Sequence, residues 1–234
     1  MTELNVDPLE IEKFQSIASR WWDPESEFKP LHDINPLRVG YIESRSGTLA
    51  DKKILDIGCG GGILAEALAL KGANLTGIDM AEKSLKVAKM HLHESGLDID
   101  YQMITAEQFA QQEAGTFDIV TCLEMLEHVP DPASIITAAT GLLKPDGQLF
   151  LSTINRNPKA FVLAILGAEY ILNMIPKGTH EYRKFIKPSE LASAVRANQM
   201  EVLDVTGMIY NPLTKHYRLG RDLDVNYLMH CSHQ

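Results

Sequence analysis

Short apolar runs alternate with amphipathic stretches from about residue 53 to residue 153. The apolar runs have the length of buried strands, and the stretches between them repeat their apolar residues at helical spacing. We expect strands at 53–57, 74–79, 99–104, 117–123 and 147–153, and helices at 62–71, 82–95 and 132–143. Strands that alternate with helices predict parallel βαβ units in an open, doubly wound sheet.

Both ends of the chain depart from this alternation. Residues 8–22 place apolar side chains close to helical spacing, and a segment broken by prolines, 23–37, follows. After residue 153 the order changes to an apolar insertion at 156–187, a helix near 188–198 and strand-like runs at 201–209 and 222–231. We therefore expect one domain over 1–234, with an N-terminal helical cap at about 8–38 and the insertion as a lid or membrane contact.

A glycine-rich loop follows the first predicted strand. Asp56 ends the strand, and four glycines between positions 58 and 62 lead into the next helix. Glycine lets the backbone take positive φ and lets a ligand lie directly on it, while the helix N-terminus offers unpaired N–H groups. A dinucleotide loop needs a small residue where Ile63 stands, and the Gly-Lys-Ser/Thr of a P-loop is absent. The loop predicts a nucleotide ligand of another class.

The second strand also ends in a carboxylate. Asp79 lies 23 positions after Asp56, close to the spacing at which an acid binds ribose hydroxyls in dinucleotide folds. The alternative is a cap for the helix that follows, because aspartate is a favoured capping residue. We favour ribose binding.

A cluster of polar side chains follows the strand at 117–123. Glu124, Glu127 and His128 would share one face if this stretch were helical. Two carboxylates and an imidazole suit Mg²⁺, Mn²⁺ or Zn²⁺. The alternative is a polar turn before Pro130, with His128 as a simple hydrogen-bond donor, and we weigh the two about equally.

Composition and charge narrow the class of protein. The net charge of −9 and pI of about 5.4 argue against a nucleic-acid partner bound through phosphates. Three cysteines, far apart and odd in number, form no disulfide or zinc pattern, which predicts a reducing cytosol. We expect no signal peptide, and no apolar run approaches the roughly 20 residues of a membrane span.

The glycine-rich loop, with its preceding strand and acid, resembles motif I of the class I S-adenosylmethionine-dependent methyltransferases. Longer segments resemble the family of ubiquinone biosynthesis O-methyltransferases: residues 18–23, 28–32, 34–38, 124–132, 155–157, 167–172, 176–180, 184–188 and 224–227. These segments cover nearly the whole chain and are more selective than motif I.

The resemblance implies a three-layer α/β/α Rossmann-like fold, with a mostly parallel seven-stranded sheet and one antiparallel strand. It implies O-methylation of a ring hydroxyl on polyprenylated catechol-type intermediates, at both O-methylation steps of ubiquinone biosynthesis. Two alternatives remain: a methyltransferase of the same fold that acts on another small-molecule or lipid phenol, and a non-catalytic S-adenosylmethionine-binding protein.

The resemblance also implies roles for individual residues. The residues expected to bind the cofactor S-adenosylmethionine are Arg38, Asp56, Gly58, Gly60, Asp79, Ala106, Glu107 and Leu123. For Ala106 and Glu107 a capped turn is an equally good interpretation. Metal binding, with Mg²⁺ as the expected ion, falls on Glu124, Glu127 and His128. We expect His128 and Glu124 to be catalytic, with His128 as general base if no metal takes part.

The apolar insertion has its most hydrophobic part at residues 160–175. These sixteen residues carry one charge, Glu169, and basic residues flank them on both sides. The segment is too short to span a bilayer but suits an interfacial helix on an anionic membrane surface. A substrate lid or a dimer contact is the alternative. We expect a cytoplasmic protein, peripherally associated with the inner membrane, with other ubiquinone-biosynthesis proteins as possible partners.

Overall fold

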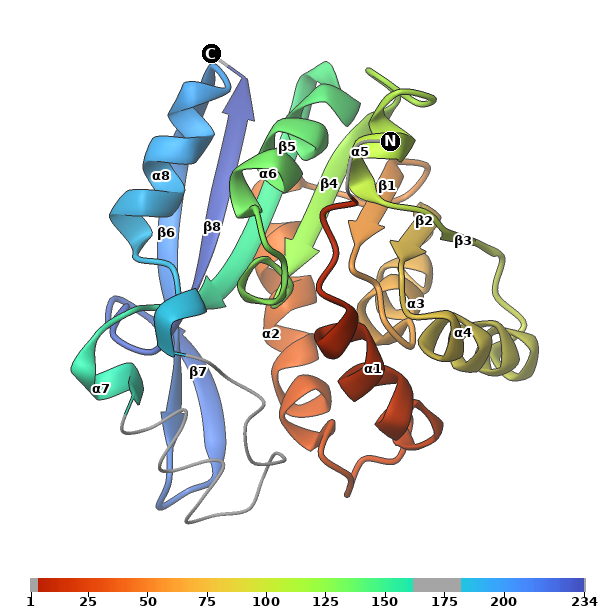
Figure 1. Ribbon diagram of the computed structural model, residues 1–234, viewed down its shortest axis with the longest axis horizontal. Helices are drawn as coiled ribbons and strands as arrows, with labels where there is room; N and C mark the ends of the chain where they lie inside the picture. The colour runs from red at the N-terminus through yellow and green to blue at the C-terminus, as the bar shows by residue number, and fades with distance from the viewer. Residues whose placement is uncertain (1–3, 162–181, 234) are drawn as a thin grey trace.

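Eight strands of the described residues, 4–161 and 182–233, form one sheet in this computed structural model (Figure 1). Their order across the sheet is β3-β2-β1-β4-β5-β8-β6-β7. The strands are β1 (Lys53–Ile57), β2 (Asn74–Asp79), β3 (Ile99–Met103), β4 (Phe117–Leu123), β5 (Leu143–Ile154), β6 (Met200–Asn211), β7 (His216–Gly220) and β8 (Asn226–His233). Strands β1 to β5 pair in parallel, and β8 inserts between β5 and β6 as an antiparallel strand.

The strand order reverses between β1 and β4. From β1 the chain moves outward to β2 and β3, and it then returns to place β4 on the other side of β1. Ligands of open α/β sheets bind outside the carboxyl ends of the strands at such a reversal. Asp56, near the end of β1, is in register with Gly77 on one side and Thr121 on the other. The topology therefore places the glycine-rich loop at the expected ligand position.

Helices cover both faces of the sheet. The chain contains α1 (Pro8–Ile17), η1 (Ala18–Arg20), α2 (Lys29–Ser46), α3 (Ile63–Ala69), α4 (Glu82–Ser95), α5 (Ala106–Ala110), η2 (Leu126–His128), α6 (Pro132–Leu142), α7 (Pro158–Ala160), η4 (Tyr182–Lys184) and α8 (Pro188–Ala197). One hydrophobic cluster joins α2, α3 and α4 to the sheet, and a second joins α5, α6 and α8 to its other face. The N-terminal segment runs from beside α5 to α1, which lies at the arrowhead ends of β4 and β1 (Figure 1).

Central strands are buried on both faces, as the apolar runs of the sequence predict. All residues of β4 except Asp118 are buried, because a parallel sheet covered by helices has no face open to water. The three-layer α/β/α fold and the mostly parallel sheet are thus confirmed. The predicted helix at 82–95 and the predicted strands at 53–57, 74–79 and 117–123 have the same bounds in the structure.

The N-terminal prediction was wrong in one respect. Residues 23–37 contain prolines and were expected to break helical structure, but α2 runs from Lys29 to Ser46 with Pro36 inside it. Proline removes one backbone hydrogen bond from a helix. Burial of the helix outweighs that loss, because Ile34, Val39 and Ile42 all pack into the core of the α2, α3 and α4 face. The helical cap at about 8–38 therefore continues to residue 46.

The sheet also has one strand more than the predicted seven. β7 pairs with β6 as an antiparallel hairpin at the edge of the sheet. Its sequence, His216–Gly220, is short and partly exposed, so it lacks the apolar run that marks the other strands. Two strands, β7 and β8, run antiparallel to the rest, where the sequence predicted one.

Within residues 4–161 and 182–233, no helix is both long enough and apolar enough to cross a membrane. Of the predicted membrane contact at 160–175, all but Ala160 and Phe161 lies outside the described residues.

A buried histidine links β8 to β5. The ring of His230 stacks on Phe150, with the ring centroids 4.6 Å apart, and its Nε2 lies 3.0 Å from Oε1 of Gln148. Burial, together with the charge of Arg45, lowers the pKa of His230 to about 4. The folded protein therefore holds this ring neutral at a pH at which an unfolded chain protonates it.

Folding stability should fall as the pH drops from 6.5 towards 4, because the His230 imidazole then binds a proton in the unfolded state but not in the folded state. The His230 contribution is at most about 3 kcal/mol. Urea unfolding at several pH values measures it. A His230→Leu variant should lose less stability than the wild type over this range, whereas a change at the exposed His93, His93→Leu, should leave the wild-type slope. Equal slopes in all three proteins would contradict the assignment.

Candidate functional site

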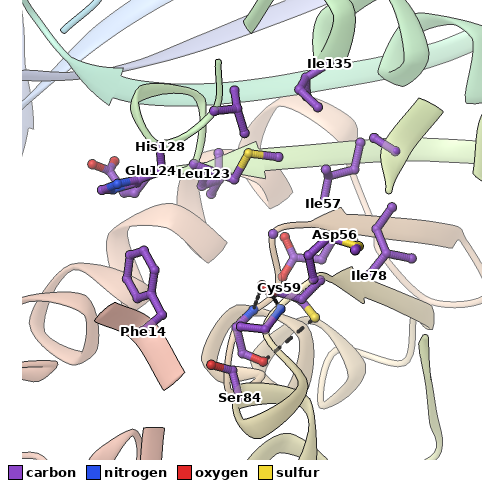
Figure 2. Close-up of a pocket in the computed structure, with 18 of the residues that line it drawn as sticks. Phe14, Asp56, Ile57, Cys59, Ile78, Ser84, Leu123, Glu124, His128 and Ile135 are labelled. Atoms are coloured by element: carbon purple, nitrogen blue, oxygen red, sulfur yellow. Dashed lines mark hydrogen bonds between the residues drawn. The ribbon is translucent and has the colours of Figure 1, made fainter. Parts of the chain in front are cut away.

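A pocket lies between the carboxyl ends of β1, β2 and β4 and the N-terminal helix (Figure 2). Its walls come from the glycine-rich loop, from the residues after β2 and β4, and from the segment between residues 5 and 21. In Figure 2, Asp56, Cys59 and Ile78 line one side, and Leu123, Glu124 and His128 line another. The cavity therefore lies where the strand order reverses, and the predicted strand-end residues line it.

Hydrogen bonds hold the glycine-rich loop against the end of β2. The N–H groups of Gly58 and Cys59 donate to the Ile78 carbonyl at 2.8 and 3.1 Å. The Gly60 N–H donates to Oδ2 of Asp79 at 2.9 Å. Gly58 and Gly60 have φ angles of 73° and 53°, a region that other residues rarely adopt. The loop is thus fixed by backbone conformations that require glycine.

The protein itself occupies part of the bare surface of the loop. A Cβ atom at Gly60 or Gly61 would lie 2.2 Å from the ring of Trp21. The neighbouring Trp22 donates from Nε1 to the Gly61 carbonyl at 2.9 Å. Gly60, a predicted ligand-binding residue, and its neighbour Gly61 therefore pack against the N-terminal segment, which closes the pocket from that side.

Two acids line the pocket, the buried Asp56 and the partly buried Asp79. Asp56 accepts a hydrogen bond from the Thr121 hydroxyl at 2.7 Å. Burial raises the pKa of Asp56 to about 7, against the opposing effects of that hydrogen bond and of the Arg38 charge. Burial also raises the pKa of Asp79, although the N–H groups of Ala81 and Gly60 donate to its carboxylate. Asp79 thus lines the pocket and accepts from Ala81, the residue before α4, while α4 itself has no side-chain cap, so the ribose role remains a prediction.

Arg38 is buried, and its guanidinium faces the same cavity. Its Nη2 lies 3.3 Å from Oε1 of Glu124, an ion pair between α2 and the end of β4. Among the described residues, Nε and Nη2 of Arg38 have no hydrogen-bond partner. A buried guanidinium with unused donors fits the carboxylate of a methionine moiety. The cationic amino group of that moiety fits Asp56, which also lines the pocket.

The segment after β3 lines the other end of the cavity. Thr105 caps α5 through the Gln108 N–H, so the predicted capped turn is present. Glu107 accepts hydrogen bonds at Oε1 from Asn5 and Ser134, while its buried Oε2 has no partner among the described residues. Such an oxygen can accept from the amino group of an adenine. Ala106 and Leu123 line the cavity as buried apolar residues.

The predicted metal ligands do not converge. Glu124 has a left-handed backbone, with φ of 56°, and only residues 126–128 are helical, so the expected shared helical face does not form. The hydroxyl of Ser152 donates to Oε1 of Glu124 at 2.6 Å, and Asn226 donates to Oε2 at 2.7 Å. Both oxygens of Glu124 are therefore already bonded to protein groups.

Glu127 and His128 point to different partners. Glu127 is buried and accepts from the Thr153 hydroxyl at 2.8 Å, and burial, with the Glu124 charge, raises its pKa. His128 contacts Glu10 of α1 through Nδ1. In residues 4–161 and 182–233, no three His, Cys, Asp or Glu side chains are grouped to hold a metal ion. This donor arrangement does not fit the predicted three-ligand centre.

Sequence reasoning predicted an N-terminal cap with Arg38 at the cofactor, but it missed other pocket residues of that segment. Asn5, Glu10, Phe14 and Trp21 all line the pocket. One signal was available for Glu10, because it shares a helical face with Phe14 and Ile17 and a charge on an apolar face is unusual. Its partner His128 lies 118 positions away, a pairing that no local pattern predicts.

Comparisons with known proteins agree with this geometry. A family described as "Methyltransferase domain" matches residues 40–205. The chain is 64% identical over 225 residues to the ubiquinone biosynthesis O-methyltransferase of Pseudomonas aeruginosa, covering 96% of this chain and 97% of that protein. It is 62% identical over 233 residues to the Marinobacter nauticus protein of the same name, covering 99% and 98%.

Solved structures of lower sequence identity share the fold. One is an S-adenosylmethionine-dependent methyltransferase from Thermotoga maritima, with a TM-score of 0.68 at 19% identity, covering 97% of this chain and 99% of that one. Another is the magnesium protoporphyrin IX methyltransferase of Synechocystis with bound S-adenosylmethionine, with a TM-score of 0.66 at 17% identity over the whole of both chains.

Binding of S-adenosylhomocysteine should strengthen as the pH rises through about 7. The cationic amino group of the ligand favours the ionised Asp56, whose pKa in the empty pocket is about 7. Titration calorimetry should give an affinity on the order of tenfold higher at pH 8 than at pH 6. Asp56→Asn should bind more weakly and lose most of this dependence, whereas Asp98→Asn, at an exposed site, should keep it. An unchanged dependence in Asp56→Asn would contradict the prediction.

Proposed function

The chain belongs to the family of ubiquinone biosynthesis O-methyltransferases, and we propose that it methylates a ring hydroxyl of polyprenylated catechol-type intermediates at both O-methylation steps. The observation that carries this proposal is the identity of 64% over 96% of the chain to a protein of that name. The pocket at the strand ends supports it, because it offers a cationic, an acidic and an apolar wall to the methyl donor.

The residues of the pocket suit S-adenosylmethionine along its length. Arg38 would bind the carboxylate of the methionine moiety and Asp56 its amino group, as opposite charges require. Asp79 would accept the ribose hydroxyls, and the backbone of Gly58 and Gly60 would lie against the donor. At the far end, Ala106 and Leu123 would cover the adenine ring, and Glu107 would accept from its amino group.

The methyl donor supplies an electrophilic methyl group on a sulfonium sulfur. The substrate oxygen forms the new C–O bond as the S–C bond breaks, and the bonding electron pair stays on sulfur. A phenol titrates near pH 10, so its proton has to be removed during transfer. His128, beside the end of β4, would accept that proton, since imidazole is a suitable base near neutral pH. The remaining task of the protein is to align the two reactants.

Glu124 would act through Arg38 in this scheme. Its carboxylate is 3.3 Å from the guanidinium and is bonded to Ser152 and Asn226, so it orients the arginine that receives the donor. Its left-handed backbone lies in a region where strain often accompanies a functional role. We route no step through Mg²⁺, because the oxygens of Glu124 are already engaged by protein donors and Glu127 and His128 are turned to other partners.

A methyl-transfer assay on a short-chain prenyl catechol tests the proposal. We expect turnover with S-adenosylmethionine, and a loss of about 100-fold in His128→Ala, since general base catalysis contributes on that order. Donor binding should be unchanged in this variant. Donor binding by the wild type without turnover would identify a non-catalytic binding protein, and turnover on unprenylated phenols alone would favour another substrate.

The same assay with a chelator decides whether a metal takes part. Turnover should persist in EDTA if His128 removes the proton unaided. Complete loss in EDTA, with recovery on Mg²⁺ addition, would show that a divalent ion takes part and would contradict the metal-free scheme.

We also propose peripheral association with an anionic membrane through residues 160–175. The support is the sequence alone: sixteen residues carry one charge and have basic flanks, and the proposed substrate carries a polyprenyl tail. The protein should float with liposomes that contain anionic lipid. Leu163→Asp and Ile171→Asp should abolish flotation, and Leu213→Asp, on the exposed β6–β7 turn, should not. Flotation unaffected by the first two changes would contradict the proposal.

A further inference from the structure

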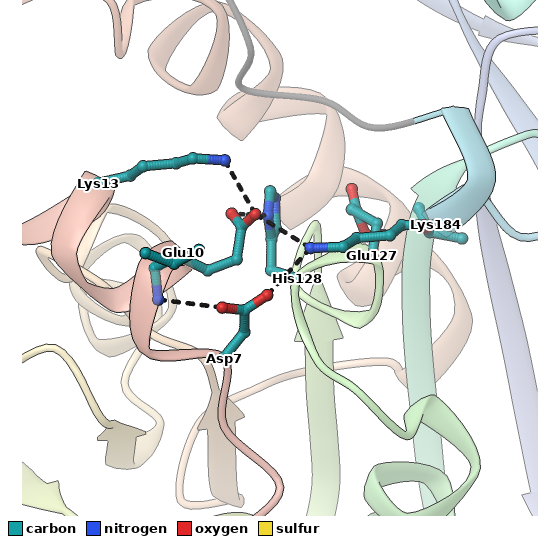
Figure 3. Close-up of polar contacts among 8 residues, drawn as sticks. Asp7, Glu10, Lys13, Glu127, His128 and Lys184 are labelled. Carbon is teal, nitrogen blue, oxygen red and sulfur yellow. Dashed lines mark hydrogen bonds and ion pairs between the residues drawn. The ribbon is translucent and has the colours of Figure 1, made fainter.

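A buried carboxylate from the N-terminal helix contacts the imidazole at the end of β4. Glu10 of α1 is only 4% exposed, and its Oε2 lies 2.9 Å from Nδ1 of His128 (Figure 3). Both residues line the pocket described above. The contact thus joins the N-terminal segment to the proposed general base.

Two lysines hold the other oxygen of this carboxylate. Lys13 Nζ lies 3.0 Å from Oε1 of Glu10, and Lys184 Nζ lies 3.2 Å from the same atom. Lys184 also contacts Asp7, the residue that caps α1 (Figure 3). The two ammonium groups compensate the buried charge and occupy Oε1, so the carboxylate presents Oε2 to the imidazole.

The protonation state of Glu10 determines which atom donates. Both lysine ammonium groups pair with Oε1 of Glu10, at 3.0 and 3.2 Å, and so favour the ionised carboxylate. An ionised carboxylate only accepts hydrogen bonds, so Nδ1 of His128 must carry the proton. A neutral imidazole protonated on Nδ1 has its basic lone pair on Nε2.

The orientation of the ring is fixed from the same helix. Phe14, one turn after Glu10, contacts the His128 ring edge-on, with centroids 5.1 Å apart and planes at 86°. Helix α1 thus supplies a charged contact to one ring atom and an apolar contact to the ring itself. Neither residue comes from the elements that carry the predicted catalytic groups.

From this geometry we infer that Glu10 is a positioning residue: it holds His128 with Nδ1 protonated, so that Nε2 takes the proton from the substrate hydroxyl. The inference rests on the proposed methyl transfer. In the reaction the O–H bond breaks as the C–O bond forms, the proton moves to Nε2, and the resulting imidazolium is stabilised by the Glu10 carboxylate. Glu10 itself stays ionised throughout.

Kinetics of matched variants distinguish this positioning role from a purely structural role, in which Glu10 only anchors α1 to the rest of the fold. Glu10→Gln should lower kcat about 10- to 100-fold and leave KM for both substrates within about threefold. Glu12→Gln removes the same charge from an exposed position of the same helix and should stay within about twofold of the wild type. In a His128→Ala background, Glu10→Gln should have almost no further effect on kcat, because the two residues act as a unit. An equal loss in both backgrounds would overturn the inference.

A spectroscopic measurement tests the pairing without turnover. Nitrogen-15 NMR of histidine-labelled protein, with the His128 signals assigned from His128→Ala, should give Nδ1–H for His128 in the wild type. Glu10→Gln should shift the ring towards the Nε2–H form, and Glu12→Gln should not. An Nε2–H ring in the wild type, or a ring unaffected by Glu10→Gln, would overturn the inference.

The two measurements also distinguish failure of the inference from failure of the proposed function. A wild type that turns over no catechol contradicts the proposed function. The NMR result still decides whether Glu10 determines which ring nitrogen of His128 carries the proton. If Glu10→Gln proves unfolded by its unfolding midpoint, Glu10→Asp takes its place. That variant keeps the charge but withdraws the carboxylate by one methylene, and should lower kcat by a smaller factor.

Discussion

The contact between the glycine-rich loop and the end of β2 is the constraint on which the rest of the site depends. The Gly60 N–H bonds to Asp79, and Gly58 and Cys59 bond to the carbonyl before it, so the ends of two parallel strands are locked together. That arrangement sets the position of the bare loop backbone. The loop in turn is the surface on which Trp21 packs, and the packing fixes where the N-terminal helix begins to cover the pocket.

The N-terminal segment supplies the walls of the pocket that the sheet does not provide. The sheet supplies acids at the strand ends, while α2 supplies Arg38 and α1 supplies Glu10. Each of these buried charges has a partner on a different element, which lowers the cost of taking it out of water. Charge pairing therefore fixes the N-terminal cap against the end of β4.

Local sequence pattern was sufficient to predict most of the sheet and two of the acids that line the pocket. Apolar runs marked β1, β2 and β4, and the position of Asp56 and Asp79 at strand ends followed from topology. Local sequence pattern failed where long-range packing determines the secondary structure. Pro36, for example, lies inside a helix because that helix is buried. The metal prediction assumed a helix at 124–128, but the left-handed Glu124 turns its side chain away from a shared face. The contact of Glu10 with His128 depends on folding of the whole chain.

The packing of the N-terminal segment on the loop has an optical consequence. The chain contains two tryptophans, and both touch the glycine-rich loop: Trp21 covers Gly60 and Gly61, and Trp22 donates to the Gly61 carbonyl and stacks on His91. The intrinsic tryptophan emission of the entire protein therefore originates at one place. The molecule carries its own fluorophore where its N-terminal cover meets the donor pocket, with no background from any other indole.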